Sequence, residues 1–453
     1  MINNIKMATN TIEVEIHHVV ENIGKTVVIN GWVHRIRRQG KKMIFIILRD
    51  GSGFVQVGVF GELAKKYNEP QTLCTESYIR IVGMIKEDSR APYAGVEVQA
   101  ETLDVLGNSN TDFDTSVQAE AGNQIALDLR HLFIRGENTS AILKIRAFLL
   151  KTLRRFYDDN GYYEVTPPSI VSNSCEGGST LFRLNYFGED AFLTQSSQLY
   201  LESAVPALGK VFCIHPSFRA EKSKTKRHLA EYTHIEMEAH NMSLEKLIEH
   251  LRQLFHYLFQ QIDNNEEIVK LAKKLNPGYK GLFYDDFMVL PYYKAVELCG
   301  ELGIMFVEDE CEPRAYLYGD DLTDKVERRL CEQLGKPVFI TQFPASMKAF
   351  YMDPRETERG LETNSSDLLF PGVGEVVGGS MRNCNYQILV EKAKEEGGSL
   401  DWYLDLRKYG AGQTGGYGIG LERIMLYILG GDPSEYSVKD CCLFPRYMGR
   451  VSP

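Results

Sequence analysis

The sequence lacks the features of membrane, secreted and metal-binding proteins. No stretch approaches the roughly 20 consecutive apolar residues that a bilayer requires. The first residues, Met1 to His18, mix Asn, Glu and His with isolated apolar residues, so no signal peptide is expected. The 9 cysteines are scattered apart from the adjacent Cys441 and Cys442, and no CxxC pair could start a zinc or redox site. A reducing, cytoplasmic compartment is therefore predicted.

Excess positive charge is also absent. The net charge of −10 argues against a protein that coats nucleic acid through bulk charge, although two local basic patches exist. Internal repeats and low-complexity segments are missing as well, which excludes fibrous and extensively disordered proteins. At 453 residues, the chain has room for two to four domains.

The first hundred residues have the pattern of a small β-barrel. Five short strand-like runs are separated by glycine turns, with a polar segment, 61–75, between the third and the fourth run. This arrangement predicts a Greek-key barrel of the OB type, an architecture that commonly holds single-stranded nucleic acid. The predicted strands are Thr26 to His34, Met43 to Leu48, Phe54 to Phe60, Ser77 to Ile85 and Gly95 to Leu106.

The rest of the chain predicts an α+β domain. Residues 108–123 are rich in Asn, Ser, Thr and Asp and are interpreted as a linker between a barrel at 1–107 and a larger domain at 124–453. Apolar residues at three- and four-residue spacing predict one helix capped by Asn138-Thr139-Ser140 and another starting near Ser243. The strand-like runs between and after these helices lack regular βαβ alternation, which favours an antiparallel sheet with flanking helices. The polar segment 268–336 is a possible insertion.

One basic cluster lies in a predicted hairpin, 217–238. On its returning strand, a period of two places Tyr232, His234, Glu236 and Glu238 on one face. The pattern suits a nucleoside triphosphate, with Arg219 on a phosphate, Arg227 and His228 over the tail and Tyr232 against the base. A solvated hairpin with ordinary surface charge is the alternative.

Two glycine-rich segments could complete such a site. Gly415 to Arg423 combines glycines, which let the backbone approach a ligand closely, with an arginine in the first turn of an amphipathic helix. In the second segment, Glu375 could hold Mg²⁺, and seven residues separate it from Arg382. Both side chains can face one pocket only if the strand contains a bulge, which we expect at Gly378-Gly379. A packing turn is the alternative for the first segment.

Together these three segments resemble the signature motifs of class II aminoacyl-tRNA synthetases, and Gly161 to Pro168 is similar to the remaining, dimer-forming motif. The barrel before the catalytic domain and the stretch Arg219 to Tyr232 are similar to the aspartyl and asparaginyl subgroup. The resemblance implies that Arg219, Arg423 and Glu375 are catalytic and that Glu375 binds Mg²⁺. The residues expected to contact ATP are Arg219, Glu221, Arg227, His228, Leu229, Tyr232, Glu375, Gly420, Leu421, Glu422 and Arg423.

The resemblance also implies an amino-acid pocket and points to its substrate. The residues expected to line it are Glu176, Gln195, Gln198, Arg219, Glu236, Gly378 and Arg382. Aspartyl enzymes carry a lysine where this chain has Leu201, an Asp where it has Glu236 and usually a Ser where it has Gly378. Without that lysine, Arg382 and Glu236 offer one donor set and one acceptor set, which matches an amide and would repel a carboxylate. Glu176 could instead be a turn residue, and Gln195 and Gln198 could cap a helix.

The other basic patch, His34 to Lys42, lies in the predicted barrel. Phe45 and Gln56 match the aromatic and the glutamine that contact the middle anticodon base in this subgroup, and Arg35 and Arg37 would position phosphates. The alternative for Phe45 is a core aromatic.

The resemblance therefore implies a ligase that activates L-asparagine with ATP and Mg²⁺, transfers it to tRNA(Asn) and forms a homodimer. A ligase for aspartate and a catalytically silent RNA-binding relative are the alternatives.

Overall fold

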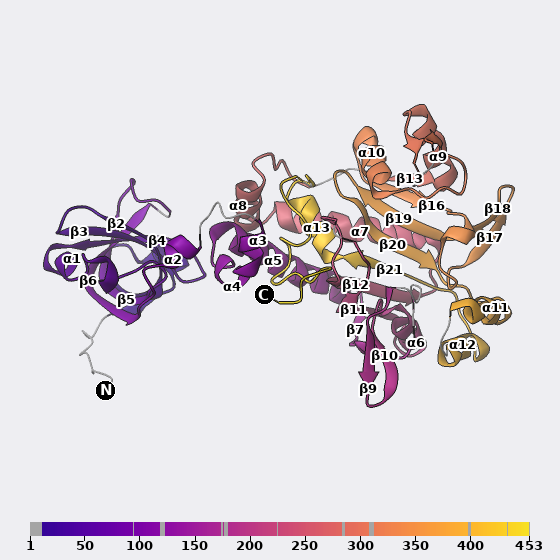
Figure 1. Ribbon diagram of the computed structural model, residues 1–453, viewed down its shortest axis with the longest axis horizontal. Coiled ribbons are helices and arrows are strands. Elements are labelled where there is room, and N and C mark those ends of the chain that lie inside the picture. The colour runs from indigo at the N-terminus through magenta and orange to yellow at the C-terminus, as the bar shows by residue number, and fades with distance from the viewer. Residues whose placement is uncertain are drawn as a thin grey trace. The chain divides into compact units, whose positions relative to one another are not determined.

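In the computed structural model, the described residues are 11–452 except 94, 118–122, 174, 176–179, 224, 283–285, 308–311, 397–399 and 433. The chain divides into two compact units, Met1–Leu129 and Arg130–Pro453 (Figure 1).

The first unit is a β-barrel built on alternating side chains. Buried residues of two neighbouring strands, Ile44, Ile46, Val57 and Val59 among them, face the core, while the residues between them face outward. The strand order is β1-β2-β3-β4-β6-β5, and a further β2–β5 pairing closes the sheet. All five predicted strands are present. The elements are β1 (Ile12–Glu13), β2 (Thr26–Arg38), β3 (Met43–Arg49), β4 (Phe54–Phe60), α1 (Gly61–Lys66), β5 (Tyr78–Glu87) and β6 (Val96–Gly107).

In the sequence, short helices follow the barrel and precede the first long helix. Part of the predicted linker is helical, because α2 (Phe113–Ser116) lies within it, and α3 (Asn123–Asp128) and α4 (Arg130–Phe133) follow.

The second unit is built on an eight-stranded sheet in the order β13-β16-β19-β20-β21-β12-β11-β7. Its pairings are antiparallel except at the two edges, where β13–β16 and β11–β7 are parallel. The predicted antiparallel α+β domain is therefore confirmed. The strands are β7 (Tyr163–Glu164), β11 (Lys210–Phe218), β12 (Glu231–His240), β13 (Met288–Pro291), β16 (Val338–Thr341), β19 (Ser365–Phe370), β20 (Gly374–Met381) and β21 (Thr414–Gly420).

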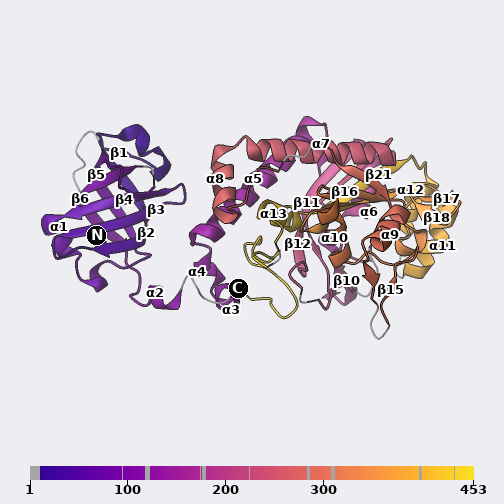
Figure 2. The ribbon, with the colours of Figure 1, turned by 90° about the horizontal axis from the view of Figure 1, so that it is seen from above.

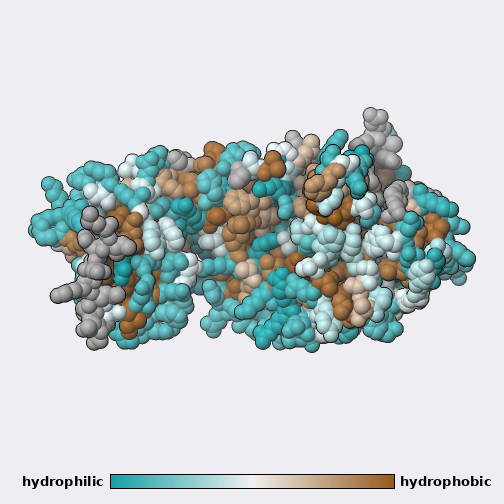
Figure 3. Space-filling model, turned by 90° about the horizontal axis from the view of Figure 1, so that it is seen from below, coloured by the Kyte–Doolittle hydropathy of each residue, from teal (hydrophilic) through white to brown (hydrophobic). Residues whose placement is uncertain are grey.

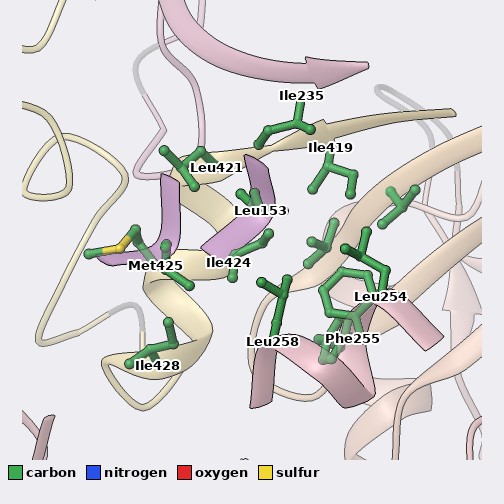
Figure 4. Close-up of a cluster of buried hydrophobic side chains, with 14 of the residues drawn as sticks. Leu153, Ile235, Leu254, Phe255, Leu258, Ile419, Leu421, Ile424, Met425 and Ile428 are labelled. Atoms are coloured by element: carbon green, nitrogen blue, oxygen red, sulfur yellow. The ribbon is translucent and has the colours of Figure 1, made fainter. Parts of the chain in front are cut away.

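Three helices cover one face of this sheet: α5 (Glu137–Asp159), α7 (Leu244–Asp263) and α13 (Leu421–Ile428). Figure 2 shows α7 running along one side of the sheet. The apolar sides of the helices meet Ile235 and Ile419 of the strands in one buried cluster (Figure 4). Burial of this apolar surface stabilises the packing of the helices on the sheet. The Ser243 hydroxyl caps α7 as predicted, accepting a hydrogen bond from Lys246 N at 3.3 Å. The other predicted cap is wrong, because α5 begins at Glu137 with Gly136 as its N-cap.

The opposite face is only partly covered. Val338 and Ile340 point away from Phe339 and pack with α9 (Tyr292–Glu301) and α10 (Asp324–Leu334) in a separate buried cluster. These helices and β13 come from the segment interpreted as an insertion, so that segment supplies an edge strand of the sheet itself. Beside them, α6 (Gln198–Leu208) and α12 (Asp401–Lys408) leave part of the face open. The remaining elements are α8 (Glu266–Leu275), α11 (Tyr386–Glu396), β8 (Ile170–Val171), β9 (Arg183–Tyr186), β10 (Glu189–Leu193), β14 (Met305–Phe306), β15 (Arg314–Ala315), β17 (Pro354–Thr357) and β18 (Gly360–Thr363).

A bulge in β20 brings Glu375 and Arg382 to the same face. Leu368 pairs with Val377 and Leu369 with Glu375, so Val376 is the extra residue. The predicted bulge therefore exists, but its predicted position at Gly378-Gly379 is wrong. Those two glycines pair regularly with β19 and β21 instead.

The surface in Figure 3 shows apolar residues in patches separated by polar ones. Among the described residues, no helix is long and apolar enough to cross a membrane.

Candidate functional site

Two adjoining cavities open on the partly uncovered face of the sheet. Both are lined by Arg219, His234, Glu375 and Gly418, which therefore mark the boundary between them. A site that joins two substrates needs this kind of junction, because the reacting atoms of both must meet at one point.

Strands β12 and β21 form the floor of both cavities. The predicted alternation of β12 is confirmed, since Ile235 and Met237 are buried in the helix-covered core while His234 and Glu236 line the cavities. Glycines stand opposite: Gly420 pairs with His234, Gly418 with Glu236 and Gly416 with Glu238. A Cβ at Gly418 would collide with His234 Nε2, and one at Gly416 with the Glu238 carboxylate. The glycine motif thus makes room for the polar side chains of its neighbour.

The first cavity contains the cations predicted for the triphosphate. All the residues predicted to contact ATP line it except Leu421, whose side chain is fully buried in the helix-covered core (Figure 4). Any contact of Leu421 with a nucleotide would have to come from its main chain. Arg219 lies over the Tyr232 ring, with 5.7 Å between its guanidinium carbon and the ring centroid. An aromatic ring and a cation therefore face the same space, as a nucleotide site requires.

Glu375 lies among these cations. Arg423 donates to its carbonyl oxygen at 2.7 Å and to Oε2 at 3.2 Å, and Arg227 donates to the same carbonyl at 3.4 Å. Burial alone would raise the pKa of Glu375, but Arg423, together with Lys348, Arg219 and Arg227, outweighs it and lowers the pKa. The carboxylate is therefore ionised at neutral pH. Arg227 is itself desolvated, which lowers its pKa to about 10, so it stays charged.

The second cavity contains most of the residues predicted for the amino acid. Gln198, Glu236, Gly378 and Arg382 line it together with Arg219. Gln195 does not, because its buried amide contacts Cys175 N at 3.2 Å and the Thr180 hydroxyl at 2.7 Å. Glu176 lies outside the described residues. The cavity residues that the sequence did not single out as ligands include Ser196, Glu238, Lys348, Tyr351 and Asp367.

Glu236 is held by its neighbours in ionised form. Its carboxylate accepts hydrogen bonds from the Ser196 hydroxyl at 2.5 Å and from Ser197 N at 2.8 Å, and His234 Nδ1 lies 3.3 Å away. Burial would raise the pKa of Glu236, but the charge of His234 and these hydrogen bonds lower it to about 2. A fixed, desolvated negative charge therefore faces the cavity.

Two glutamates, Glu238 and Glu202, lie against the Arg382 guanidinium. Its Nε donates to Glu238 at 2.6 Å and its Nη1 to the Ser380 hydroxyl at 2.7 Å. Glu202 of α6 lies 3.8 Å from Arg382 and also binds Arg407 of α12 at 2.5 Å. This alternating network of two arginines and two glutamates fixes the Arg382 guanidinium at the cavity wall.

Lys348 and Asp367 form a second neutral pair in this cavity, with 2.5 Å between Nζ and Oδ2. Asp367 and Glu375 flank Gly378, since a Cβ there would lie 3.2 Å from Glu375 Oε1 and 3.8 Å from Asp367 Oδ1. No group of three or more His, Cys, Asp or Glu side chains in the described ranges could hold a metal by itself. Two carboxylates beside the predicted phosphate site do fit Mg²⁺, which prefers one or two carboxylates plus substrate phosphates.

The outer face of the barrel carries the other predicted surface. Phe45 is outside the buried barrel core, half-buried, with the Arg37 guanidinium carbon 5.0 Å from its ring centroid. Arg35 and Arg37 are both exposed on β2. Gln56 donates to Glu97 at 2.7 Å, a partner that the sequence did not indicate. The core alternative for Phe45 is wrong, and its half-buried ring lies beside Arg37 and edge-on to Phe60.

Comparison with known proteins identifies the family. Residues 122–448 match the family model described as tRNA synthetases class II (D, K and N), and residues 27–106 match the OB-fold nucleic acid binding domain. The chain belongs to the class II tRNA synthetases. This synthetase is 41% identical over 454 residues to the cytoplasmic asparagine–tRNA ligase of Debaryomyces hansenii, an alignment that covers 97% of the chain and 79% of the relative. The cytoplasmic location named for this relative agrees with the compartment predicted from the cysteines.

Solved structures give the same result for the synthetase fold. The asparaginyl-tRNA synthetase of Entamoeba histolytica in complex with asparaginyl-adenylate matches with a TM-score of 0.84 and 37% identity, covering 95% of this chain and 97% of that one. The corresponding complex from Pyrococcus horikoshii matches with a TM-score of 0.85 and 35% identity, covering 97% and 99%. The predicted barrel-plus-catalytic-domain architecture is confirmed.

Proposed function

We propose that the protein is an asparagine–tRNA ligase, which activates L-asparagine with ATP and transfers it to tRNA(Asn). The relatives described above are named for this activity, and both solved structures hold asparaginyl-adenylate. The geometry supports the same substrate through the charges of the second cavity.

The observation that carries the proposal is the charge balance of that cavity. Arg382 donates to Glu238, a carboxyl whose pKa burial raises, and Lys348 pairs with Asp367. The ionised Glu236 lies 3.3 Å from His234 and accepts from Ser197 N. Arg219, whose Nη1 lies 3.9 Å from Glu221 Oε1, stands at the junction with the nucleotide cavity. An α-carboxylate can meet Arg219 there, but a second carboxylate at the Glu236 end would be repelled. An amide can instead donate to Glu236 and accept from Arg382.

Activation then follows from positioning. The asparagine carboxylate oxygen attacks the α-phosphate, a P–O bond forms, and pyrophosphate leaves with its electron pair. Arg219 stabilises the charge on the α-phosphate from the junction of the cavities, and Arg423 and Arg227 bind the remaining phosphates. No protein nucleophile is required. In the second step, the terminal ribose hydroxyl of tRNA attacks the acyl carbon and an ester bond forms. The acyl–phosphate bond breaks, and AMP leaves with its phosphate taking the hydroxyl proton.

Glu375 would hold Mg²⁺, with Asp367 as the neighbouring oxygen donor. When bound, the ion would neutralise part of the phosphate charge. Gly378 leaves the space between these two carboxylates free of side-chain atoms.

We also propose that the barrel binds the anticodon of tRNA(Asn) through Phe45, Gln56, Arg35 and Arg37. The support is the half-buried Phe45 ring outside the barrel core, its cationic neighbour Arg37 and the match of the barrel to a nucleic acid binding domain.

A homodimer completes the proposal. It is supported by the edge position of β7, which lies in the segment that resembles the dimer-forming motif. Tyr163 is 59% exposed there, so this edge offers apolar surface for a second copy of the chain. Sedimentation equilibrium of the purified chain tests it, and a monomer at micromolar concentration would refute it.

The decisive test of the activity is ATP–pyrophosphate exchange with asparagine and with aspartate. We expect exchange with asparagine and rejection of aspartate by roughly 10⁴, because the site would leave polar partners mismatched. A preference for aspartate would overturn the substrate assignment, and no exchange with either would favour a silent relative.

A further inference from the structure

Helix α10 reaches the predicted nucleotide site from a segment to which the sequence assigned no role. It packs on β19 and β20, as Figure 1 shows, and its N-terminal turns present Asp324 and Glu327 toward the start of β20. Both carboxylates contact Arg227, one of the cations that line the first cavity. Asp324 forms an ion pair with Arg227, and Glu327 Oε2 lies 3.9 Å from Arg227 Nη1.

Glu327 also holds the main chain of Glu375. Its Oε2 accepts a hydrogen bond from Glu375 N at 3.0 Å, while Arg423 and Arg227 donate to the carbonyl oxygen of the same residue. The Glu375 backbone is thus held at both its donor and its acceptor. The Glu375 carboxylate is held separately, by Arg423 at 3.2 Å.

The approach of α10 to β20 depends on a glycine. Gly374 has φ +81°, and a Cβ there would lie 2.9 Å from Glu327 Oε2 and 3.2 Å from Arg227 Nη1. A side chain at this position would push Glu327 away from Glu375. The missing side chain at Gly374 is a second observation beside the hydrogen bond, and it shows that β20 leaves space for the Glu327 carboxylate.

A purely structural ion pair is the competing explanation. The Glu327 side chain is 15% exposed and lies beside the carboxylate-bearing Glu375, so placing a carboxylate here costs stability. A fold that needed only an acceptor for Glu375 N could use a neutral amide. The presence of a carboxylate at Glu327 is better explained by its contact with Arg227, because a negative charge orients the guanidinium.

We propose that Glu327 is a positioning residue for the nucleotide site, holding Glu375 and Arg227 in the arrangement that receives the ATP tail and its Mg²⁺. The inference rests on the proposed function for the location of the tail. Asp324 also pairs with Arg227, through its Oδ1.

The test compares Glu327→Ala and Glu327→Gln with Glu332→Ala, an exposed glutamate on the same helix. Calorimetry measures binding of ATP with and without Mg²⁺ in the absence of amino acid, and separately binding of asparagine. For Glu327→Ala we expect MgATP binding weakened roughly tenfold, as for loss of one charge-assisted contact, and asparagine binding within about twofold of wild type. Glu332→Ala should match the wild type.

Glu327→Gln keeps an acceptor for Glu375 N but loses the charge that orients Arg227. We expect its MgATP affinity to lie between those of Glu327→Ala and the wild type, and this variant decides the matter if Glu327→Ala does not fold. Unchanged MgATP affinity in either folded variant would overturn the proposal. An equal loss of ATP and asparagine binding, accompanied by a lower melting temperature, would also overturn it in favour of a structural role. Because ATP binding is measured without amino acid, a wrong substrate assignment would not affect this result.

Discussion

Replacing Glu236 with glutamine removes one charge from the second cavity and little else. The carboxylate now accepts from the Ser196 hydroxyl and from Ser197 N. A glutamine can keep both contacts, since its carbonyl oxygen can accept from Ser197 N while its NH₂ donates to the Ser196 hydroxyl oxygen. The change therefore tests the negative charge with the packing preserved.

The expected magnitudes follow from that charge. A hydrogen bond to a charged group contributes about 1.5 to 3 kcal/mol, so kcat/KM for asparagine should fall roughly 10- to 150-fold. Two carboxylates about 4 Å apart repel by about 4 kcal/mol at an effective dielectric constant of 20, so aspartate should gain up to roughly 10³-fold. Together the two effects should lower the preference for asparagine over aspartate by about five orders of magnitude at most.

ATP–pyrophosphate exchange with each amino acid measures both effects. The KM for ATP should stay unchanged, because Glu236 does not line the nucleotide cavity. Glu231→Gln is the matched control, since Glu231 begins the same strand and is exposed. The reasoning fails if the folded Glu236→Gln enzyme uses asparagine within threefold of the wild type and still rejects aspartate as strongly.

Three further outcomes are expected. Gly418→Ala should abolish exchange in a folded protein because its Cβ would displace His234, whereas Gly412→Ala, with nothing within 4 Å of its Cβ, should be neutral in the same assay. Burial, and then the charge of Lys210, lowers the pKa of His250 to about 4, below its unfolded value of about 6.5. Neutral His250 therefore stabilises the fold above pH 6.5, and this contribution to stability is lost as the pH falls. In urea unfolding, the stability difference between the wild type and His250→Gln should shrink by about 2 kcal/mol from pH 7 to pH 5, and a pH-independent difference would contradict this. Phe45→Ala should weaken tRNA charging by roughly 1 to 3 kcal/mol while pyrophosphate exchange, which needs no tRNA, stays normal; equal loss of both would point to a folding defect instead.

Local periodicity predicted much of the fold. The five barrel strands and the β12 face, with Ile235 buried and Glu236 turned to the cavity, follow from a period of two that the structure keeps. The Ser243 cap was also readable, because the hydroxyl stands directly before an apolar helical pattern. The start of α5 could not be predicted in this way, because Gly136 offers no capping side chain and the polar residues after it suggest a later start.

The candidate site was predicted where its residues lie in contiguous motifs. The cations of the loop after Arg219 and the helix at Arg423 meet in one cavity as expected. The contact of Gln195 with the amino acid stays a prediction. Its buried amide bonds Cys175 N, and the sequence position of a glutamine does not show which way its side chain points.

Residues that act through distant pairs escaped prediction. Asp367 reaches Glu375 because the bulge at Val376 shifts the register between β19 and β20, and a one-residue shift exchanges the two faces of a strand. The sequence indicates that a bulge is needed but not where it lies, because a valine at the bulge looks like any strand residue. The role of Glu327 is still harder to predict from the sequence, since its partner Glu375 is 48 residues away. The one local signal is Gly374, whose missing side chain leaves room for a carboxylate from elsewhere. A glycine directly before a predicted ligand is therefore a place to look for a residue that the motifs do not contain.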